Sequence, residues 1–218
     1  MKIIQVCKRL NNDESGGNNN HDHFIDLPNK VDMDMLIFNS SKYIDFTDKR
    51  DNKIINLSLF TNRNWIKKLR PYYEKYDLHA GDEIILEKRI HDDGKEEYFI
   101  DHLKYNSIII QKKPFYNEDT DQKFQSFECL KGDINSFKEE HGDLITINSI
   151  GSFKRNKSKN TKHNKKEKEY FYECFEIIQN DENLLDKYRV NDLVEIQVVN
   201  NKVNVTFINK GIIYEMEV

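Results

Sequence analysis

The sequence contains few of the residue types that mark particular classes of protein. Its 218 residues include one alanine (Ala80), three prolines, eight glycines and three cysteines. Cys7, Cys129 and Cys174 are odd in number and widely separated, so they form neither a disulfide framework nor a zinc-ligand pattern. We therefore expect a protein from a reducing, intracellular compartment. The glycines form no loop of the kind that holds phosphate groups.

Long apolar runs are also missing. No run approaches the roughly 18 residues that a helix needs to cross a bilayer, and the apolar stretch within residues 1–9 is too short for a signal peptide. We therefore expect neither a membrane protein nor a secreted one. The 34 basic and 38 acidic residues give a net charge of -4, so the chain as a whole is not a polycation.

Strand-forming residues are abundant. The chain has 13 phenylalanines, 11 tyrosines and 25 asparagines, with many isoleucines and valines. Alanine is the best helix former and asparagine a poor one, whereas β-branched and aromatic residues favour strands. The composition predicts a mainly β protein, and its apolar content is too high for a disordered chain despite a mean hydropathy of -0.82.

A cluster of polar, turn-forming residues divides the sequence nearly in half. Residues 117–121 (Asn-Glu-Asp-Thr-Asp) follow Pro114. We predict two small β-barrels, one over residues 1–116 and one over residues 127–218, joined by a linker over residues 117–126.

The two halves share a pattern near their ends. Each places a Lys-Tyr pair and a polar turn before a strand that continues into a hairpin, over residues 75–100 and 187–208. The predicted hairpin turns are at residues 91–94 and at Asn200-Asn201. The pattern indicates two barrels that end alike. The N-terminal half also predicts a short helix over residues 64–70, with Asn64 as its N-cap and Pro71 as its end.

The C-terminal half carries motifs in a characteristic order. Lys131-Gly132 is followed by an aromatic segment around Phe137, a Glu-Glu-His-Gly turn at residues 139–142 and a second aromatic strand over residues 170–179. This order, over about residues 128–210, resembles a cold-shock domain. The resemblance implies a five-stranded oligonucleotide-binding barrel that stacks aromatic residues on the bases of single-stranded DNA or RNA, with Lys131 and Phe137 at the binding face.

Tyr170 and Tyr172 are the best stacking candidates under this resemblance. The first ribonucleoprotein motif departs from the family, because residues 141–146 lack stacking aromatics and include Asp143, which repels phosphate. Since successive side chains of a strand alternate between its two faces, the aromatic residues of the second motif either stack on bases or fill the barrel. The sequence leaves both alternatives open.

A lysine-rich loop lies between the two candidate RNA-motif strands. Within residues 151–168, eight basic residues are opposed by Glu167 alone: Lys154, Arg155, Lys157, Lys159, Lys162, Lys165, Lys166 and Lys168. A flexible cationic loop beside a barrel strand suits the neutralisation of nucleic-acid phosphates. The alternative is a solvated loop that confers solubility.

The N-terminal half resembles a different DNA-binding fold. A hairpin pattern over residues 43–60 is followed by the predicted helix, and the sequence Leu-His-Ala-Gly-Asp-Glu-Ile at residues 78–84 leads into a strand. This order, over about residues 33–113, is similar to the B-three DNA-binding pseudobarrel. The resemblance implies recognition of duplex DNA by loops that enter the major groove, one of them at residues 61–64.

Three residues of that loop are candidates for base contacts. Asparagine and arginine pair bidentately with adenine and guanine edges, so the candidates are Asn62, Arg63 and Asn64. The alternative is structural, in which Asn64 caps the predicted helix and Arg63 is exposed to solvent.

No catalytic set emerges from the sequence. A metal nuclease of the PD-(D/E)-x-K type needs one residue between its glutamate and its lysine, but Glu87 and Lys88 are adjacent and so point to opposite faces of a strand. The His-Asp-His sequence at residues 21–23 has no third ligand nearby. We therefore predict no enzyme, no metal site and no cofactor.

Two classes of function remain. The first is a non-catalytic protein that binds nucleic acid with tandem β-barrels, single-stranded DNA or RNA at the C-terminal barrel and duplex DNA at the N-terminal one, in the cytoplasm, nucleoid or nucleus. The second is a protein–protein scaffold or accessory subunit, whose barrels keep the fold without the binding chemistry. The basic loop and the two resemblances favour the first function. The negative net charge and the missing stacking residues favour the second.

Overall fold

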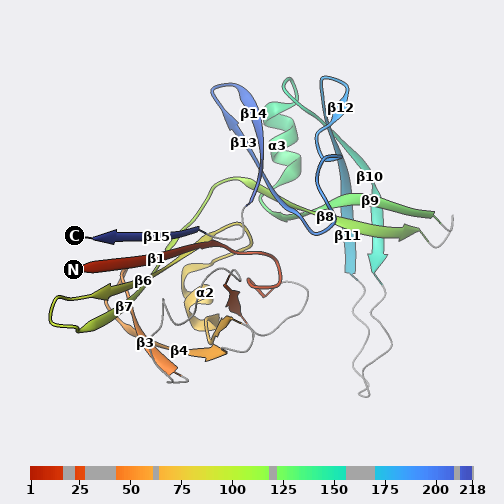
Figure 1. Cartoon of the computed structure of the whole chain (residues 1–218). Coiled ribbons are helices and arrows are strands. Elements are labelled where there is room, and N and C mark those ends of the chain that lie inside the picture. The colour runs from red at the N-terminus through yellow and green to blue at the C-terminus, as the bar shows by residue number, and fades with distance from the viewer. Residues whose placement is uncertain are drawn as a thin grey trace, which may run out of the picture. The chain divides into compact units, whose positions relative to one another are not determined.

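The computed structural model describes residues 1–16, 23–27, 43–60, 64–117, 122–155, 170–208 and 212–217, some strand segments as backbone alone. The protein is mainly β, as its composition predicts, and its strands form two curled half-barrel sheets (Figure 1). Each sheet belongs to one compact unit. Unit 1 comprises Met1–Asn106 and Ile208–Val218, and unit 2 comprises Ser107–Phe207.

Unit 1 contains an eight-stranded sheet in the order β15-β1-β6-β7-β3-β4-β5-β2. Its strands are β1 (Lys2–Arg9), β2 (Phe24–Asp26), β3 (Tyr43–Asp48), β4 (Ile54–Phe60), β5 (Trp65–Lys67), β6 (Glu83–Ile90), β7 (Glu96–Leu103) and β15 (Ile212–Glu217). Neighbours are antiparallel, except that β3 and β7 pair in parallel. The predicted hairpins over residues 43–60 and around residues 91–94 are confirmed as β3–β4 and β6–β7.

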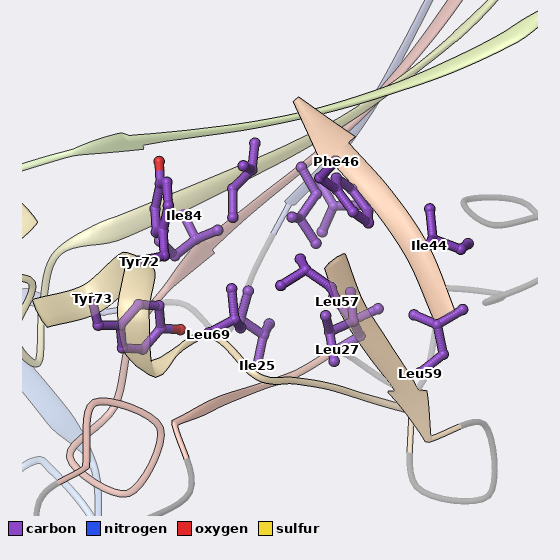
Figure 2. Close-up of a cluster of buried hydrophobic side chains, with 14 of the residues drawn as sticks. Ile25, Leu27, Ile44, Phe46, Leu57, Leu59, Leu69, Tyr72, Tyr73 and Ile84 are labelled. Atoms are coloured by element: carbon purple, nitrogen blue, oxygen red, sulfur yellow. The ribbon is translucent and has the colours of Figure 1, made fainter. Parts of the chain in front are cut away.

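The inner face of this sheet carries the core of unit 1. Ile44 and Phe46 of β3 and Leu57 and Leu59 of β4 point into one cluster of buried side chains (Figure 2). Since alternate side chains of a strand point to opposite faces, the residues between and beside these four lie on the outer face. The candidate site of unit 1 lies there.

The short helix of unit 1 begins later in the sequence than predicted. Helix α2 spans Arg70–Tyr76, with Pro71 in its first turn rather than at its end. Proline suits this place, because the first turn of a helix has no partner for its N–H groups and the fixed φ of proline is already helical. The predicted helix over residues 64–70 is wrong, since Trp65–Lys67 forms β5, with Ile66 buried between two more exposed neighbours.

Unit 2 contains a second sheet, in the order β10-β11-β9-β8-β13-β14, with β12 paired to β11. Its strands are β8 (Ile108–Asn117), β9 (Gln122–Lys131), β10 (Thr146–Arg155), β11 (Tyr170–Gln179), β12 (Glu182–Asn183), β13 (Leu193–Val199) and β14 (Lys202–Phe207), and all its pairs are antiparallel. The predicted hairpin at Asn200-Asn201 is confirmed as β13–β14, and both asparagines have positive φ. Its core includes Phe127, Phe175 and Val194.

A helix replaces the aromatic strand that the cold-shock resemblance implies around Phe137. Helix α3 spans Ile134–His141, and the Asp133 side chain caps it by accepting hydrogen bonds from two backbone N–H groups of the first turn. Phe137 packs from this helix against the core of unit 2. The implied strand is therefore wrong, because an N-cap aspartate directs the following residues into a helix.

The boundary between the units differs from the predicted one. Residues 117–126 are predicted as a linker, but β8 and β9 pair with each other within that segment, with Asn117 opposite Gln122. Hairpin turns and linkers use the same residue types, so the composition of this segment does not distinguish them. The chain instead passes from unit 1 to unit 2 at residues 106–107 and returns at residues 207–208.

One turn has the same side-chain bond in both units. In unit 1, Oδ2 of Asp82 accepts a hydrogen bond from the N–H of His79 at 2.9 Å. In unit 2, Oδ2 of Asp192 accepts the same bond from the N–H of Arg189 at 2.8 Å. In each unit the turn leads into the first strand of a hairpin, β6–β7 or β13–β14.

The backbone of this turn is also shared. The residue before each aspartate, Gly81 or Asn191, has a positive φ. The N–H of this residue donates a hydrogen bond to the carbonyl of a residue in another segment, and the N–H of that same residue donates back to the carbonyl of the aspartate. The partner residue is Leu10 after β1 in unit 1 and Lys112 of β8 in unit 2, and the four distances are 2.8–3.1 Å. The sequence pattern shared by the two halves therefore corresponds to a shared strand, turn and hairpin.

Candidate nucleic-acid interface

The turn between β4 and β5 contains the candidate residue Asn64. Asn64 has a φ of 51°, and its carbonyl oxygen accepts a hydrogen bond from the N–H of Leu27 at 3.0 Å. Asparagine tolerates this left-handed backbone better than most residues, which explains its place in the turn. It does not cap a helix, because α2 begins only at Arg70. The other two candidates of this loop, Asn62 and Arg63, lie outside the described residues.

Three aromatic residues lie beside this turn on the outer face of the sheet. Phe60 at the end of β4 is directly opposite Trp65 at the start of β5. Tyr43 lies one strand further, opposite Ser58 of β4. Phe60 is 42 % exposed and Tyr43 is 43 % exposed, whereas Leu59 on the inner face is 5 % exposed. Both residues therefore present a large accessible surface on the outer face of the sheet.

Two lysines lie over these rings. Nζ of Lys67 is 5.2 Å from the centre of the Phe60 ring and 5.3 Å from that of Trp65. Nζ of Lys68 is 4.4 Å from the centre of the Tyr43 ring. An ammonium group over an aromatic face gains about 0.5–1 kcal/mol at an exposed site. We call Tyr43, Phe60, Trp65, Lys67 and Lys68 the ring–lysine surface.

The alternation of β5 explains how these side chains come to share one face. Ile66 is fully buried on the inner face, so Trp65 and Lys67 on either side of it point outward. Lys68 follows with a φ of 70°, a left-handed conformation that ends the strand. The ring centres of Trp65 and Phe24 of β2 are 4.6 Å apart. The indole is thus held in place by its neighbour.

Two acidic residues border the ring–lysine surface. Asp45, on the outer face of β3, accepts a hydrogen bond from Nδ2 of Asn56 at 2.7 Å. Asp26 of β2 is exposed and lies opposite Trp65. The two lysines are therefore balanced by two carboxylates in their neighbourhood.

A polar network joins α2 to the turn of the β3–β4 hairpin, at the opposite end of these strands from the ring–lysine surface. The fully buried Asp48 accepts hydrogen bonds from Nζ of Lys75 at 2.9 Å and from the hydroxyl of Tyr76 at 2.6 Å. Lys75 also donates to Asp51 at 2.7 Å, and this bond lowers the pKa of Asp51 to about 2. Because these groups satisfy one another, the network fixes the helix against the hairpin.

His102 of β7 packs against the same helix. Its Nδ1 is 2.9 Å from the hydroxyl of Tyr72, and its ring centre is 4.4 Å from that of Tyr76. Burial, and then the nearby Arg50 guanidinium, lower the pKa of His102. The imidazole is therefore neutral at neutral pH and belongs to the packing of unit 1.

Two candidate residues of unit 2, Lys131 and Phe137, are less exposed than a nucleic-acid contact would lead one to expect. Lys131 is the last residue of β9, opposite Ile109 of β8, and is half-buried. Phe137 packs against the core, and its ring meets that of His141 edge-on with the centres 4.8 Å apart. Phe137 therefore contributes to the core.

The lysine-rich loop connects two paired strands. The backbone of Arg155 is opposite that of Tyr170, and Phe153 is opposite Tyr172, so the candidates Lys154, Arg155, Tyr170 and Tyr172 come together in one ladder. The predicted loop bounds of 151–168 are therefore wrong at the start, because residues 151–155 belong to β10. The predicted position of the basic segment between two strands is confirmed. The remaining loop candidates lie outside the described residues: Lys157, Lys159, Lys162, Lys165 and Lys166.

Sequence reasoning missed the ring–lysine surface. A helix over residues 64–70 places Trp65 and Ile66 on one face, whereas the strand places them on opposite faces. The signal that identifies the strand is Pro71, once it is interpreted as the start of a helix rather than its end. The single tryptophan of the chain then falls on the outer face of β5.

Comparisons with protein-family models, with curated proteins and with solved structures find no match to this chain. Among the described residues, no three His, Cys, Asp or Glu side chains are grouped so as to hold a metal ion. In that same part of the chain, no helix has the length and apolar character that a membrane span requires. Function is therefore inferred from the geometry of the chain itself.

Proposed function

We propose that the chain is a non-catalytic nucleic-acid-binding protein with tandem β-barrels. The observation that carries this proposal is the ring–lysine surface of unit 1. Exposed aromatic rings interleaved with cations on a sheet are the means by which many proteins hold bases and phosphates together. The surface adjoins the loop at residues 61–64, whose Asn62 and Arg63 have side chains suited to base edges.

The likeness of unit 1 to the B-three pseudobarrel supports the same proposal. The β3–β4 hairpin, a short helix and then Gly81-Asp82 before β6 follow one another in the order on which the resemblance rests. The structure departs from the resemblance in having β5 between the hairpin and the helix, which begins later than implied. By this likeness, the loop at residues 61–64 contacts duplex DNA.

For unit 2, the lysine-rich loop supports the proposal more strongly than the cold-shock likeness, which α3 weakens. The loop joins β10 to β11, and Tyr170 and Tyr172 begin the second of these strands. A cationic loop at the end of a hairpin releases counterions when it meets a phosphate chain. A nucleic-acid partner implies an intracellular location, in the cytoplasm, nucleoid or nucleus.

Salt-dependent binding of the full chain tests the proposal. Single-stranded and duplex DNA and RNA are titrated between about 50 and 200 mM salt. Replacing five loop lysines by glutamine should weaken binding to every sequence and flatten the salt dependence by roughly one unit per lost phosphate contact. These lysines are Lys157, Lys159, Lys162, Lys165 and Lys166.

A charge-matched variant provides the control. It replaces five exposed lysines elsewhere by glutamine, namely Lys95, Lys104, Lys138, Lys187 and Lys202. If both variants lose the same affinity and slope, the loop acts only through net charge. If the unaltered chain binds none of the four ligands, the protein–protein scaffold becomes the better hypothesis.

A further inference from the structure

The ring–lysine surface has the layout of a stacking platform. The Cβ atoms of Phe60 and Trp65, a directly opposed pair, are about 4.5–5.5 Å apart. Tyr43 belongs to the next strand, about 4.8 Å away in the pairing direction. Three rings on three adjacent strands match the two or three bases that other sheet surfaces stack.

The rings are covered by groups that nucleic acid can displace. Lys67 lies over two rings and Lys68 over the third. Stacking of a base on a ring is stronger than a cation–π pair at an exposed site. A base is therefore expected to displace the ammonium group, and the flexible lysine stem allows that group to reach the adjoining phosphate.

The geometry selects unpaired bases. Bases within a duplex stack on their neighbours and offer only their edges, in the grooves. Flat rings on the outer face of a sheet can stack on the faces of bases, and these faces are exposed only in a single strand. Asp26 and Asp45 border the surface, so its charge alone does not attract a duplex backbone.

We propose that the ring–lysine surface binds single-stranded nucleic acid by stacking unpaired bases on Tyr43, Phe60 and Trp65. Lys67 and Lys68 then contact the phosphates between these bases. This inference rests on the proposed function and names the ligand class at this site. It is separate from any contact of the loop at residues 61–64 with a duplex.

Trp65 reports on this surface directly, because it is the only tryptophan of the chain. The full chain is titrated with an oligothymidylate and, separately, with a duplex of the same length. The single strand should quench the Trp65 fluorescence strongly, and the duplex, which contacts only the neighbouring loop, should quench it much less. Lys67→Gln combined with Lys68→Gln should reduce the salt slope for the single strand by about 1.4, which is about 0.7 for each lost contact.

Ring substitutions test the stacking itself. Phe60→Leu and Tyr43→Leu should each weaken single-strand binding about 5- to 150-fold, the effect of losing one base–ring stack. Phe207→Leu is the matched control, because Phe207 is a ring of unit 2 that is 45 % exposed, and it should bind like the unaltered chain. Far-UV circular dichroism and the Trp65 emission of each free variant check that it folds.

Three results distinguish this inference from the proposed function. Equal quenching by duplex and single strand overturns the inference, and so does unaltered single-strand binding of both Phe60→Leu and Tyr43→Leu. Binding of the duplex without quenching by the single strand also overturns it but leaves the proposed function standing. If neither ligand binds at any salt concentration, both fail.

Discussion

Replacement of Asp82 by alanine should destabilise unit 1 strongly. The carboxylate is fully buried at the turn before β6. Its two oxygens accept hydrogen bonds from the N–H of His79 at 2.9 Å and the N–H of Tyr105 at 3.1 Å. Alanine removes both acceptor oxygens at once, so the N–H groups of His79 and Tyr105 both lose the carboxylate as their hydrogen-bond partner.

The expected magnitude follows from these two bonds. A hydrogen bond to a charged group contributes about 1.5–3 kcal/mol. Because both N–H groups are only partly buried, water replaces part of each bond, and we expect a loss of about 3–4 kcal/mol in the free energy of unfolding of unit 1. Asp192, at the equivalent turn, is half-buried and accepts from the N–H of Arg189 at 2.8 Å. Asp192→Ala should therefore cost only about 1 kcal/mol.

Urea unfolding measures both effects. Trp65 fluorescence follows unit 1 alone, since the chain has one tryptophan, and far-UV circular dichroism follows both units. Asp82→Ala should lower the midpoint of the Trp65 transition by more than about 1 M urea. A cost below about 1 kcal/mol, or equal costs for Asp82→Ala and Asp192→Ala, would show that the backbone bonds to Leu10 hold the turn without the carboxylate.

Three further predictions concern single side chains. Burial lowers the pKa of His102 below its unfolded value of about 6.5. The stability that the neutral imidazole contributes is therefore fully present above about pH 6.5 and is lost as the pH falls toward the lowered pKa. The urea midpoint of His102→Gln should depend less on pH than that of the unaltered chain, and an unchanged dependence would contradict this. Burial raises the pKa of the Cys7 and Cys129 thiols to about 11. In a Cys174→Ser variant, both thiols should therefore react slowly with a thiol reagent until urea unfolds the chain. Fast labelling of the folded variant would refute the raised pKa. Arg63→Ala should cost about 1–3 kcal/mol at one base position if this arginine contacts guanine in a duplex, and an unchanged sequence preference would remove it from the interface.

The hairpins could be predicted from the sequence because short turns specify them locally. Gly94 ends an Asp-Gly pair with a φ of 82°, and Asn200-Asn201 takes positive φ at both residues. Such residues are the ones that tight hairpin turns require. A turn prediction therefore needs no knowledge of the rest of the fold.

Helix α3 and strand β5 were missed because their patterns are too short to decide between helix and strand. Periodicity distinguishes the two only over longer segments, and β5 contains three residues. The prediction of each element also depends on a residue that is compatible with two structures. Pro71 begins a helix as readily as it follows one, and Asp133 followed by Ser136 is both a polar turn and an N-cap.

The ring–lysine surface depends on the pairing of strands that are distant in sequence. Tyr43 meets Lys68 only because β3 pairs with β4 and β4 with β5 in one register. A shift of one residue in either pairing would move the rings to the inner face. The sequence alone shows the rings and the lysines but not that they share a face.

The negative net charge argues less against nucleic-acid binding than the composition suggests. Affinity for a phosphate chain depends on the cations within a Debye length of it, about 8–10 Å at physiological salt. Eight of the 34 basic residues lie within residues 154–168, so a chain with a net charge of -4 can still present a strongly positive loop to a ligand.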